Sequence, residues 1–263
     1  MFSSRPALAE ALFPAMENRL HLDILPQPDD STCGPTCLHA VYRYYGDTIS
    51  LEQVIRESPK FEEGGTVAAH LGYHALRRGY RAVIYTFNLQ VFDPTWFRHD
   101  APPLDALLAR QIVRKDSPSL HRATDAYRQF LQEGGEICME DLTAGLIRKY
   151  LVREAPILTG LSATYLYRTP RESGPRCEPD DIGGYPAGHF VVLCGYDRAT
   201  RSVLVADPLL SNPFGPQHHY VVALDRVICA ILLGVLTDDA NLLIVEPSKK
   251  LKGRPCANPH RLQ

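Results

Sequence analysis

The chain has 263 residues, 45% of them hydrophobic, which is enough for one large domain with a real core. Its 28 Lys and Arg nearly balance its 30 Asp and Glu, so a net charge of −2 gives no electrostatic reason to expect nucleic acid or an anionic membrane as partner. No stretch approaches the roughly 20 apolar residues of a membrane span, and the segment 1–21 lacks the apolar stretch of a signal peptide. We therefore expect a soluble, cytoplasmic protein.

Seven cysteines stand at irregular spacing, and their odd number argues against a fully paired disulfide framework. We expect most of them to be reduced. Cys33 and Cys37 are one helical turn apart rather than in a CxxC pair, and the adjacent His218–His219 do not share a helix face. His70 and His74 share a predicted helix face but lack a third ligand, so we expect partly exposed helix residues there. The sequence thus predicts no metal and no cofactor.

The first predicted helix follows a loop rich in turn-forming residues, QPDDSTCGP. Apolar and aromatic residues then recur at helical spacing over 33–45. Pro35 is tolerated in the first turn of a helix, and Gly46 is a stop signal. Cys33 is therefore expected at the N-terminus of this helix.

Two shorter helices and a strand come next. Ser50 is placed to cap a helix at 51–57, and Thr66 to cap a third helix that ends before Gly79. The segment 80–87 alternates and is rich in β-branched and aromatic residues, which is typical of a strand.

The segment 88–150 has a looser helical pattern interrupted by prolines, with Gly134–Gly135 as a turn. We interpret it as a helical insertion or lid. Trp96 and Phe97 in this segment are either exposed anchors for a partner or part of a satellite hydrophobic cluster, and the second interpretation is favoured.

The C-terminal third is predicted to be mostly strands, separated by Gly, Pro, Asp or Asn turns, with one helix at 225–236. The predicted strands are 156–161, 189–196, 202–206, 220–224 and 242–245. Helices followed by a strand cluster indicate an α+β fold, in which an antiparallel sheet carries helices on one side. We expect a single domain over 1–247 and a flexible basic tail over 248–263.

Cys33 stands where a thiol could become a nucleophile. A thiol reacts as the thiolate, and its pKa falls at a helix N-terminus beside an imidazolium. The following Gly34 leaves the backbone approachable, whereas Cys37, one turn later, is expected to point into the core. The alternative for Cys33 is a buried small hydrophobic residue, the ordinary role of a cysteine.

Three further residues complete a candidate catalytic group. His189 opens the apolar run FVVLCGY, and Asp207 ends the next predicted strand, so a hairpin between the strands would bring the two together. A carboxylate that accepts a hydrogen bond from the imidazole fixes its tautomer and stabilises its charge. Gln27, six residues before Cys33, could present its amide beside the sulfur as an oxyanion donor with the Cys33 backbone N–H. Each residue alone has a structural explanation, but all four together favour catalysis.

The run QPDDSTCGPTCLHAVYRYYG resembles the active-site segment of the bacteriocin-processing, double-glycine leader peptidases, and GHFVVLCGYD with VLVADP resembles their histidine and aspartate blocks. The resemblance implies a papain-like cysteine peptidase fold, with Cys33 as nucleophile, His189 as base, Asp207 as orienting residue and Gln27 as oxyanion donor. The usual acidic residue before the cysteine is Thr32 here. With no membrane span and no nucleotide-binding loop, the chain is similar to stand-alone members without transporter domains.

The sequence therefore predicts a cysteine peptidase or amidase that acts on a peptide or protein substrate, in peptide processing or maturation, through a Cys33 thioester. Two alternatives remain open. An acyltransferase or peptide-modifying enzyme would resolve the same thioester with an amine, and a non-catalytic papain-like module would bind peptides without turnover. The presence of both Cys33 and His189 favours an enzyme.

Overall fold

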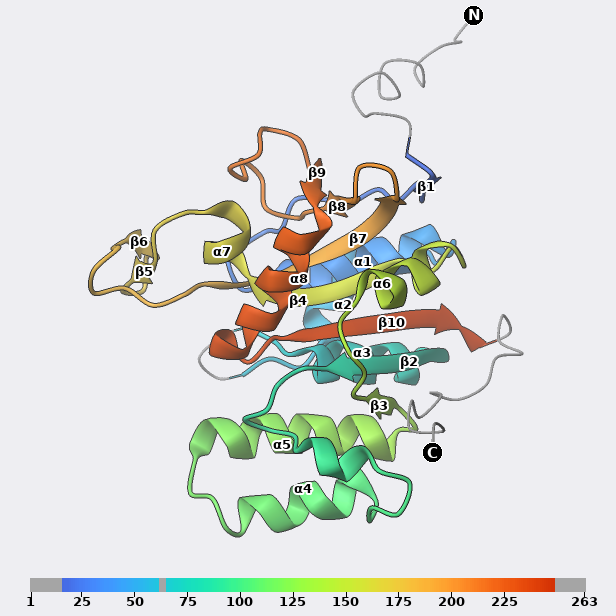
Figure 1. Ribbon diagram of the computed structural model, residues 1–263, viewed down its shortest axis with the longest axis vertical. Helices are drawn as coiled ribbons and strands as arrows, with labels where there is room; N and C mark the ends of the chain where they lie inside the picture. Colours follow the sequence, from blue (N-terminus) through green and yellow to red (C-terminus); the bar gives the residue numbers. More distant parts are fainter. Residues whose placement is uncertain (1–15, 62–64, 249–263) are drawn as a thin grey trace, which may run out of the picture.

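The computed structural model describes residues 16–61 and 65–248, and its centre is an eight-stranded sheet (Figure 1). Strands pair in the order β3-β2-β10-β4-β7-β8-β9, and β1 pairs with β7. All of these pairs are antiparallel except β2 with β3. The strands are β1 (Asn18–Arg19), β2 (Tyr80–Thr86), β3 (Glu136–Cys138), β4 (Ile157–Ser162), β7 (Gly188–Asp197), β8 (Ser202–Ala206), β9 (His219–Ala223) and β10 (Asn241–Pro247), and a separate small sheet contains β5 (Glu172–Ser173) and β6 (Glu178–Pro179).

The helices cover both faces of the sheet. Figure 1 shows α1, α2 and α3 behind it and α8 in front of it. The helices are α1 (Cys33–Tyr44), α2 (Leu51–Glu57), α3 (Ala68–Arg77), α4 (Leu104–Ile112), α5 (Pro118–Gln132), α6 (Ala144–Leu151), α7 (Ala163–Tyr167) and α8 (Leu224–Leu233), with 3-10 helices η2 (Pro94–Phe97) and η3 (Gly234–Thr237).

The α+β fold class with a mainly antiparallel sheet is confirmed, but the expectation of helices on one side was wrong. β4 is buried along its whole length, because α1 packs against it from one face and α8 from the other. A strand buried on both faces shows no alternation of apolar and polar residues. Such a strand reads as an apolar run, so FVVLCGY in β7 was a usable signal of a second helical layer that the sequence analysis did not take up.

Local signals placed the N-terminal helices well. α1 begins at Cys33 as predicted, and the Ser50 side chain accepts a hydrogen bond from the Gln53 amide at 3.2 Å, so it caps α2. The prediction that Thr66 caps α3 was wrong. The helix starts only at Ala68, and the Thr66 hydroxyl donates instead to the Pro59 carbonyl at 3.1 Å.

The segment 88–150 is not wholly helical. Its α4 and α5 pack as a pair beyond α3, but β3 then joins the central sheet beside β2, and α6 packs against β4 and β7. β3 has three residues, too few to show a strand period in the sequence. That this segment is an insertion or lid stays a prediction; the first turns of α5 do reach the candidate site described below.

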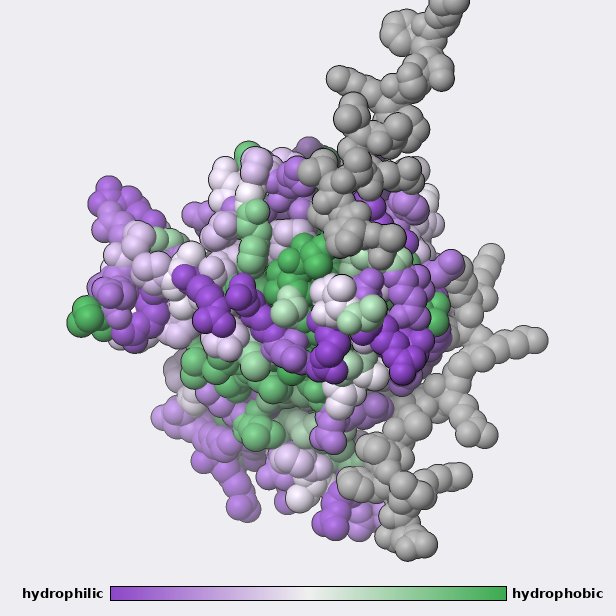
Figure 2. All heavy atoms as spheres, turned by 45° about the horizontal axis from the view of Figure 1, so that its top comes forward, coloured by the Kyte–Doolittle hydropathy of each residue, from purple (hydrophilic) through white to green (hydrophobic). Residues whose placement is uncertain are grey.

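The aromatic residues of this segment pack rather than protrude. Trp96 and Phe97 are half-buried and contact the hydrophobic core, as the satellite-cluster interpretation predicted. Phe97 also borders a hollow of about 930 Å³ together with Leu89 and Leu232. Figure 2 shows hydrophobic side chains near the middle of one face, surrounded by hydrophilic ones.

His70 and His74 are buried, with 8% and 6% of their surface exposed, so the expectation of partial exposure was wrong. The reason is that α3 packs between α1, α5 and the sheet. The Tyr42 hydroxyl lies 2.8 Å from His74 Nδ1. Within residues 16–61 and 65–248, no helix has the length and apolar character needed to cross a bilayer. Apart from Ser248, the predicted basic tail lies outside the described residues.

Candidate active site

The candidate site lies where α1 meets the start of β7. Cys33 is the first residue of α1, preceded by a loop that Thr32 closes on itself. The Thr32 hydroxyl donates to the Asp29 carbonyl at 2.9 Å and accepts from the Asp29 amide at 3.2 Å. Thr32, fully buried, thus holds the turn that presents Cys33. The helix bonds begin with the Thr36 amide, which donates to the Thr32 carbonyl, so the Cys33 amide lies among the first-turn donors that have no partner within the helix.

The hairpin of β7 and β8 brings His189 and Asp207 together. Val192 pairs with Ala206, so Asp207 leaves the sheet at the end where β7 begins. His189 Nε2 lies 2.9 Å from Asp207 Oδ1, and both side chains are almost fully enclosed. The hairpin thus brings the two side chains into contact, as the strand pattern predicted, and the orienting role of Asp207 stays a prediction.

Asp207 accepts hydrogen bonds from further donors that the sequence analysis did not identify. The hydroxyls of Tyr167 and Tyr220 each donate to Oδ2 at 2.7 Å, and the Leu209 amide donates to Oδ1 at 2.9 Å. Tyr220 lies on β9 opposite Val205, so its place in a predicted strand next to Asp207 was a usable signal. Tyr167 comes from α7, and no sequence pattern placed that helix here.

The electrostatics favour an ion pair between Cys33 and His189. Burial works against charge on the imidazole, but hydrogen bonds to Asp207 and Cys33 outweigh it and raise the pKa of His189 to about 10. Burial likewise opposes a thiolate, yet hydrogen bonding to His189 and the amides of Phe190 and Gly34 lowers the pKa of Cys33 below the usual thiol value. For Asp207, burial is again outweighed, and its hydrogen bonds lower its pKa. The sulfur, the imidazole and the carboxylate therefore form one connected line.

Cys37 differs from Cys33 in every respect that matters for reactivity. It is fully buried one turn later, and its thiol donates to the Phe190 carbonyl at 3.2 Å. Burial raises the pKa of Cys37 well above the usual value. It is a core residue, as predicted. Free thiols among the described residues are those of Cys33, Cys37, Cys177, Cys194 and Cys229.

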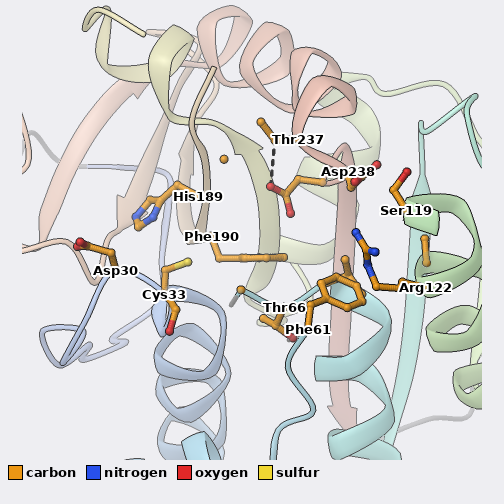
Figure 3. A pocket seen from close by; sticks show the side chains of 16 residues that line it. Asp30, Cys33, Phe61, Thr66, Ser119, Arg122, His189, Phe190, Thr237 and Asp238 are labelled. Atoms are coloured by element: carbon orange, nitrogen blue, oxygen red, sulfur yellow. Dashed lines mark hydrogen bonds between the residues drawn. The ribbon is translucent and has the colours of Figure 1, made fainter. Parts of the chain in front are cut away.

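A pocket of about 280 Å³ opens beside this line (Figure 3). Figure 3 shows Cys33 at the end of α1, His189 on the neighbouring strand, and Arg122 across the pocket. The pocket is bordered by the loop before α1, the segment before α3, the start of α5, the start of β7 and the turn from η3 to β10. Cys33 and His189 both line this pocket, so the nucleophile candidate is accessible to a substrate.

Of the predicted site residues, Cys33 and His189 line the pocket, Asp207 lies behind His189, and Gln27 is not in the lining. Its backbone N–H donates to the Pro208 carbonyl at 2.9 Å, which ties its loop to the residue after Asp207. Its side-chain Nε2 donates to the Asp29 carbonyl at 3.0 Å, and its Oε1 is buried without a partner among the described residues. The structure therefore brings together Cys33, His189 and Asp207, and leaves the oxyanion role of Gln27 a prediction.

Within residues 16–61 and 65–248, no cluster of three His, Cys, Asp or Glu side chains has the geometry to hold a metal ion.

The pocket lining contains an acidic residue that the sequence analysis did not name. Asp239, in the turn before β10, borders it with Cys33 and His189. The sequence analysis missed this residue, because it occurs in an ordinary turn sequence, TDDAN.

No protein-family profile matches the chain, and no curated protein matches it. Solved structures do. A double-glycine motif protease from an AMS/PCAT transporter, in complex with the leader peptide, is 13% identical and covers 88% of this chain and 96% of its own, with a TM-score of 0.42. The peptidase domain of Streptococcus ComA, a bifunctional ABC transporter involved in quorum sensing, is 15% identical over 86% of this chain and 99% of its own, with a TM-score of 0.41.

Xylellain, a cysteine protease from Xylella fastidiosa, is 14% identical over 93% of this chain and 91% of its own, with a TM-score of 0.43. Because all three TM-scores lie below 0.5, the roles assigned to residues below rest on the contacts within this chain alone.

Proposed function

We propose that this chain is a cysteine peptidase or amidase that cleaves a peptide or amide bond of a peptide or protein substrate. The observation that carries the proposal is the line from the Cys33 sulfur through the His189 imidazole to the buried Asp207 carboxylate, at the wall of an accessible pocket. A nucleophile, a base and an orienting group in hydrogen-bond contact are what acyl transfer to a thiol requires.

In the first step the Cys33 thiolate attacks the carbonyl carbon of the scissile bond and forms a C–S bond, while the carbonyl electrons move to its oxygen. The imidazolium of His189 then donates its proton to the leaving nitrogen, and the C–N bond breaks as the carbonyl re-forms. The products are a free amine and a thioester on Cys33. Asp207 stabilises the charged ring throughout and does not itself become protonated.

In the second step neutral His189 takes a proton from water, and the resulting hydroxide attacks the thioester carbon. The C–S bond breaks, the thiolate returns, and the proton on His189 restores the ion pair. An amine in place of water gives acyl transfer by the same steps. The two outcomes differ in the product and not in the residues used.

The oxyanion needs donors on the α1 side of the sulfur. The Cys33 backbone N–H belongs to the first turn of α1, where amides have no partner within the helix, and the positive end of the helix dipole adds to its effect. Gln27 is proposed as the second donor. One hydrogen of its amide is used by Asp29, which leaves the other for the oxyanion.

The test is the rate of Cys33 alkylation by iodoacetamide from pH 4 to pH 9, read by peptide mass spectrometry, in the parent protein and in His189→Ala. We expect Cys33 to react well below pH 8.5, the pKa of a free thiol, and to lose this advantage in the variant. Ordinary thiol titration in both proteins would overturn the proposal and favour a non-catalytic peptide-binding module. Peptide turnover abolished by Cys33→Ala then completes the assignment.

A further inference from the structure

Asp239 is a buried carboxyl group that the proposed mechanism does not use. It follows η3 in the turn that leads into β10, only 6% of its surface is exposed, and it borders the same pocket as Cys33 and His189. Its Oδ2 accepts one hydrogen bond, from the Thr237 hydroxyl at 3.2 Å, which Figure 3 marks with a dashed line. No described residue donates a hydrogen bond to its Oδ1. Half of this carboxyl group therefore has no partner among the described residues.

Two glycines make room for this carboxyl group. A Cβ atom on Gly160 would lie 2.7 Å from Asp239 Oδ1, and one on Gly188 would lie 2.5 Å from Oδ2. Real Cβ atoms do not come this close to another heavy atom, so any larger residue at either position would push the carboxyl group away. The glycines of β4 and β7 thus let both strands pass close to the Asp239 carboxyl group. Gly188 directly precedes His189, which places the carboxyl group next to the catalytic pair.

The charges around the pocket do not neutralise Asp239. Asp30 and Asp238 line the same pocket, and the thiolate of Cys33 lies close enough to disfavour a further negative charge. Burial, the Cys33 thiolate and Asp238 raise the pKa of Asp239 well above its usual range, and the smaller opposite effect of His189 does not offset them. Arg122 lies across the pocket, stacked 5.9 Å from the centre of the Phe61 ring, and no ion pair joins it to Asp239.

We propose that Asp239 is a specificity-determining residue that binds a cationic side chain of the substrate, an ammonium or guanidinium group, next to the scissile bond. The inference deepens the proposed function and rests on it. The raised pKa favours the neutral form of Asp239 in the empty pocket, and a cation placed against Oδ1 supplies the missing hydrogen bond and stabilises the ionised form, which few other substrate groups do. The pocket of about 280 Å³ holds one such side chain.

The first test uses Cys33 itself as the reporter and needs no substrate. Three methanethiosulfonate reagents of similar size, with an ammonium, a neutral methyl or a sulfonate end, are reacted with the protein at pH 7 and 150 mM NaCl, and the rate at Cys33 is read by peptide mass spectrometry. We expect the cationic reagent to react about tenfold faster than the anionic one. In Asp239→Asn this ratio should fall at least fivefold.

Asp30→Asn is the matched control, because it removes a carboxylate at the exposed rim of the same pocket. We expect it to change the ratio less than twofold, since exposed charges are screened by salt. The inference is overturned if the parent protein reacts equally fast with the cationic and the anionic reagent. It is also overturned if Asp239→Asn leaves the ratio of the two rates unchanged. Should Asp239→Asn fail to fold, the ratio in the parent protein decides.

The second test compares two peptide substrates that differ only in a lysine or the uncharged norleucine beside the scissile bond, scanned over the two residues on each side. We expect kcat/KM to favour lysine about tenfold at one position and to lose this preference in Asp239→Asn, with the norleucine peptide little affected. Turnover without any charge preference overturns the inference and leaves the proposed function standing. A Cys33 that is unreactive toward every reagent overturns the proposed function and the inference with it.

Discussion

Replacing Tyr167 by Phe removes one of the two hydroxyl groups that donate to Asp207 Oδ2, and little else. The ring remains, so its contacts with His189, at 6.1 Å between ring centres, and with Phe214, at 6.0 Å, are retained. Asp207 is fully buried, so water cannot replace the lost 2.7 Å bond. A hydrogen bond to a buried charged group contributes about 1.5–3 kcal/mol. We expect the free energy of unfolding at pH 7 to fall by this amount.

The sign of the pH dependence follows from the lowered pKa of Asp207. A carboxyl whose pKa is lowered on folding stabilises the protein above its unfolded pKa of about 3.9, and this stabilisation is lost as pH falls through the folded value. The difference between parent and variant should therefore be constant from pH 7 to about pH 5 and shrink in stronger acid. The carboxylate stays ionised at neutral pH and, with one donor fewer, attracts the imidazolium no less. Cys33 should thus keep its reactivity toward iodoacetamide at low pH.

The assay is urea unfolding at several pH values, combined with the alkylation profile of Cys33. Tyr127→Phe is the matched control, because the Tyr127 hydroxyl is buried without a hydrogen-bond partner among the described residues, and its removal should be neutral or slightly stabilising. If Tyr167→Phe unfolds at the same urea concentration as Tyr127→Phe, the hydroxyl does not stabilise Asp207. If Tyr167→Phe loses the low-pH reactivity of Cys33, the carboxylate needs this donor to hold the imidazole, which would refute the expectation that the ion pair survives the substitution.

Three further predictions concern single side chains. Asp207→Asn should shift the pH at which Cys33 becomes reactive upward and cut turnover by about 10²- to 10⁴-fold, since the carboxylate holds His189 charged; an unshifted alkylation profile would contradict this. Burial lowers the pKa of His70 to about 4, so the imidazole is neutral in the folded protein. The stability that depends on this neutral imidazole is fully present above pH 6.5 and is lost as the pH falls toward 4. Between pH 7 and pH 5, the free energy of unfolding of His70→Gln should therefore fall by about 2 kcal/mol less than that of the parent, as measured by urea unfolding. Equal decreases would show that His70 is not held in its neutral form by burial. Native iodoacetamide labelling at pH 8 should modify Cys33 and spare Cys37, and comparable labelling of both would place Cys37 outside the core.

Much of the candidate triad could be predicted from sequence because its signals are local. The start of α1 at Cys33 follows from turn-forming residues, a first-turn proline and helical spacing. The proximity of His189 and Asp207 follows from two strands joined by a tight turn. In such a hairpin the start of the first strand lies beside the end of the second. Sequence analysis therefore identified these residues from neighbours within about 20 positions.

The contact of Cys33 with that pair was decided by the tertiary structure, because more than 150 residues separate Cys33 from His189. So was the order of the sheet, in which β10 lies between β2 and β4, far from both in sequence. An apolar run indicates a strand buried on both faces, but it does not say which strand lies beside it or which helix covers it.

Two of the residues missed in the site contact partners that are distant along the chain. Tyr167 reaches Asp207 from a separate helix, and Asp239 fits against Gly160 and Gly188 of two other strands. In sequence Asp239 is one of two aspartates in a turn, and the glycines are ordinary breaks in apolar runs. The candidates for the nucleophile, the base and the orienting residue were thus determined by local sequence. Which groups surround these candidates and border the pocket was decided by packing, since burial and partners exist only once distant elements meet.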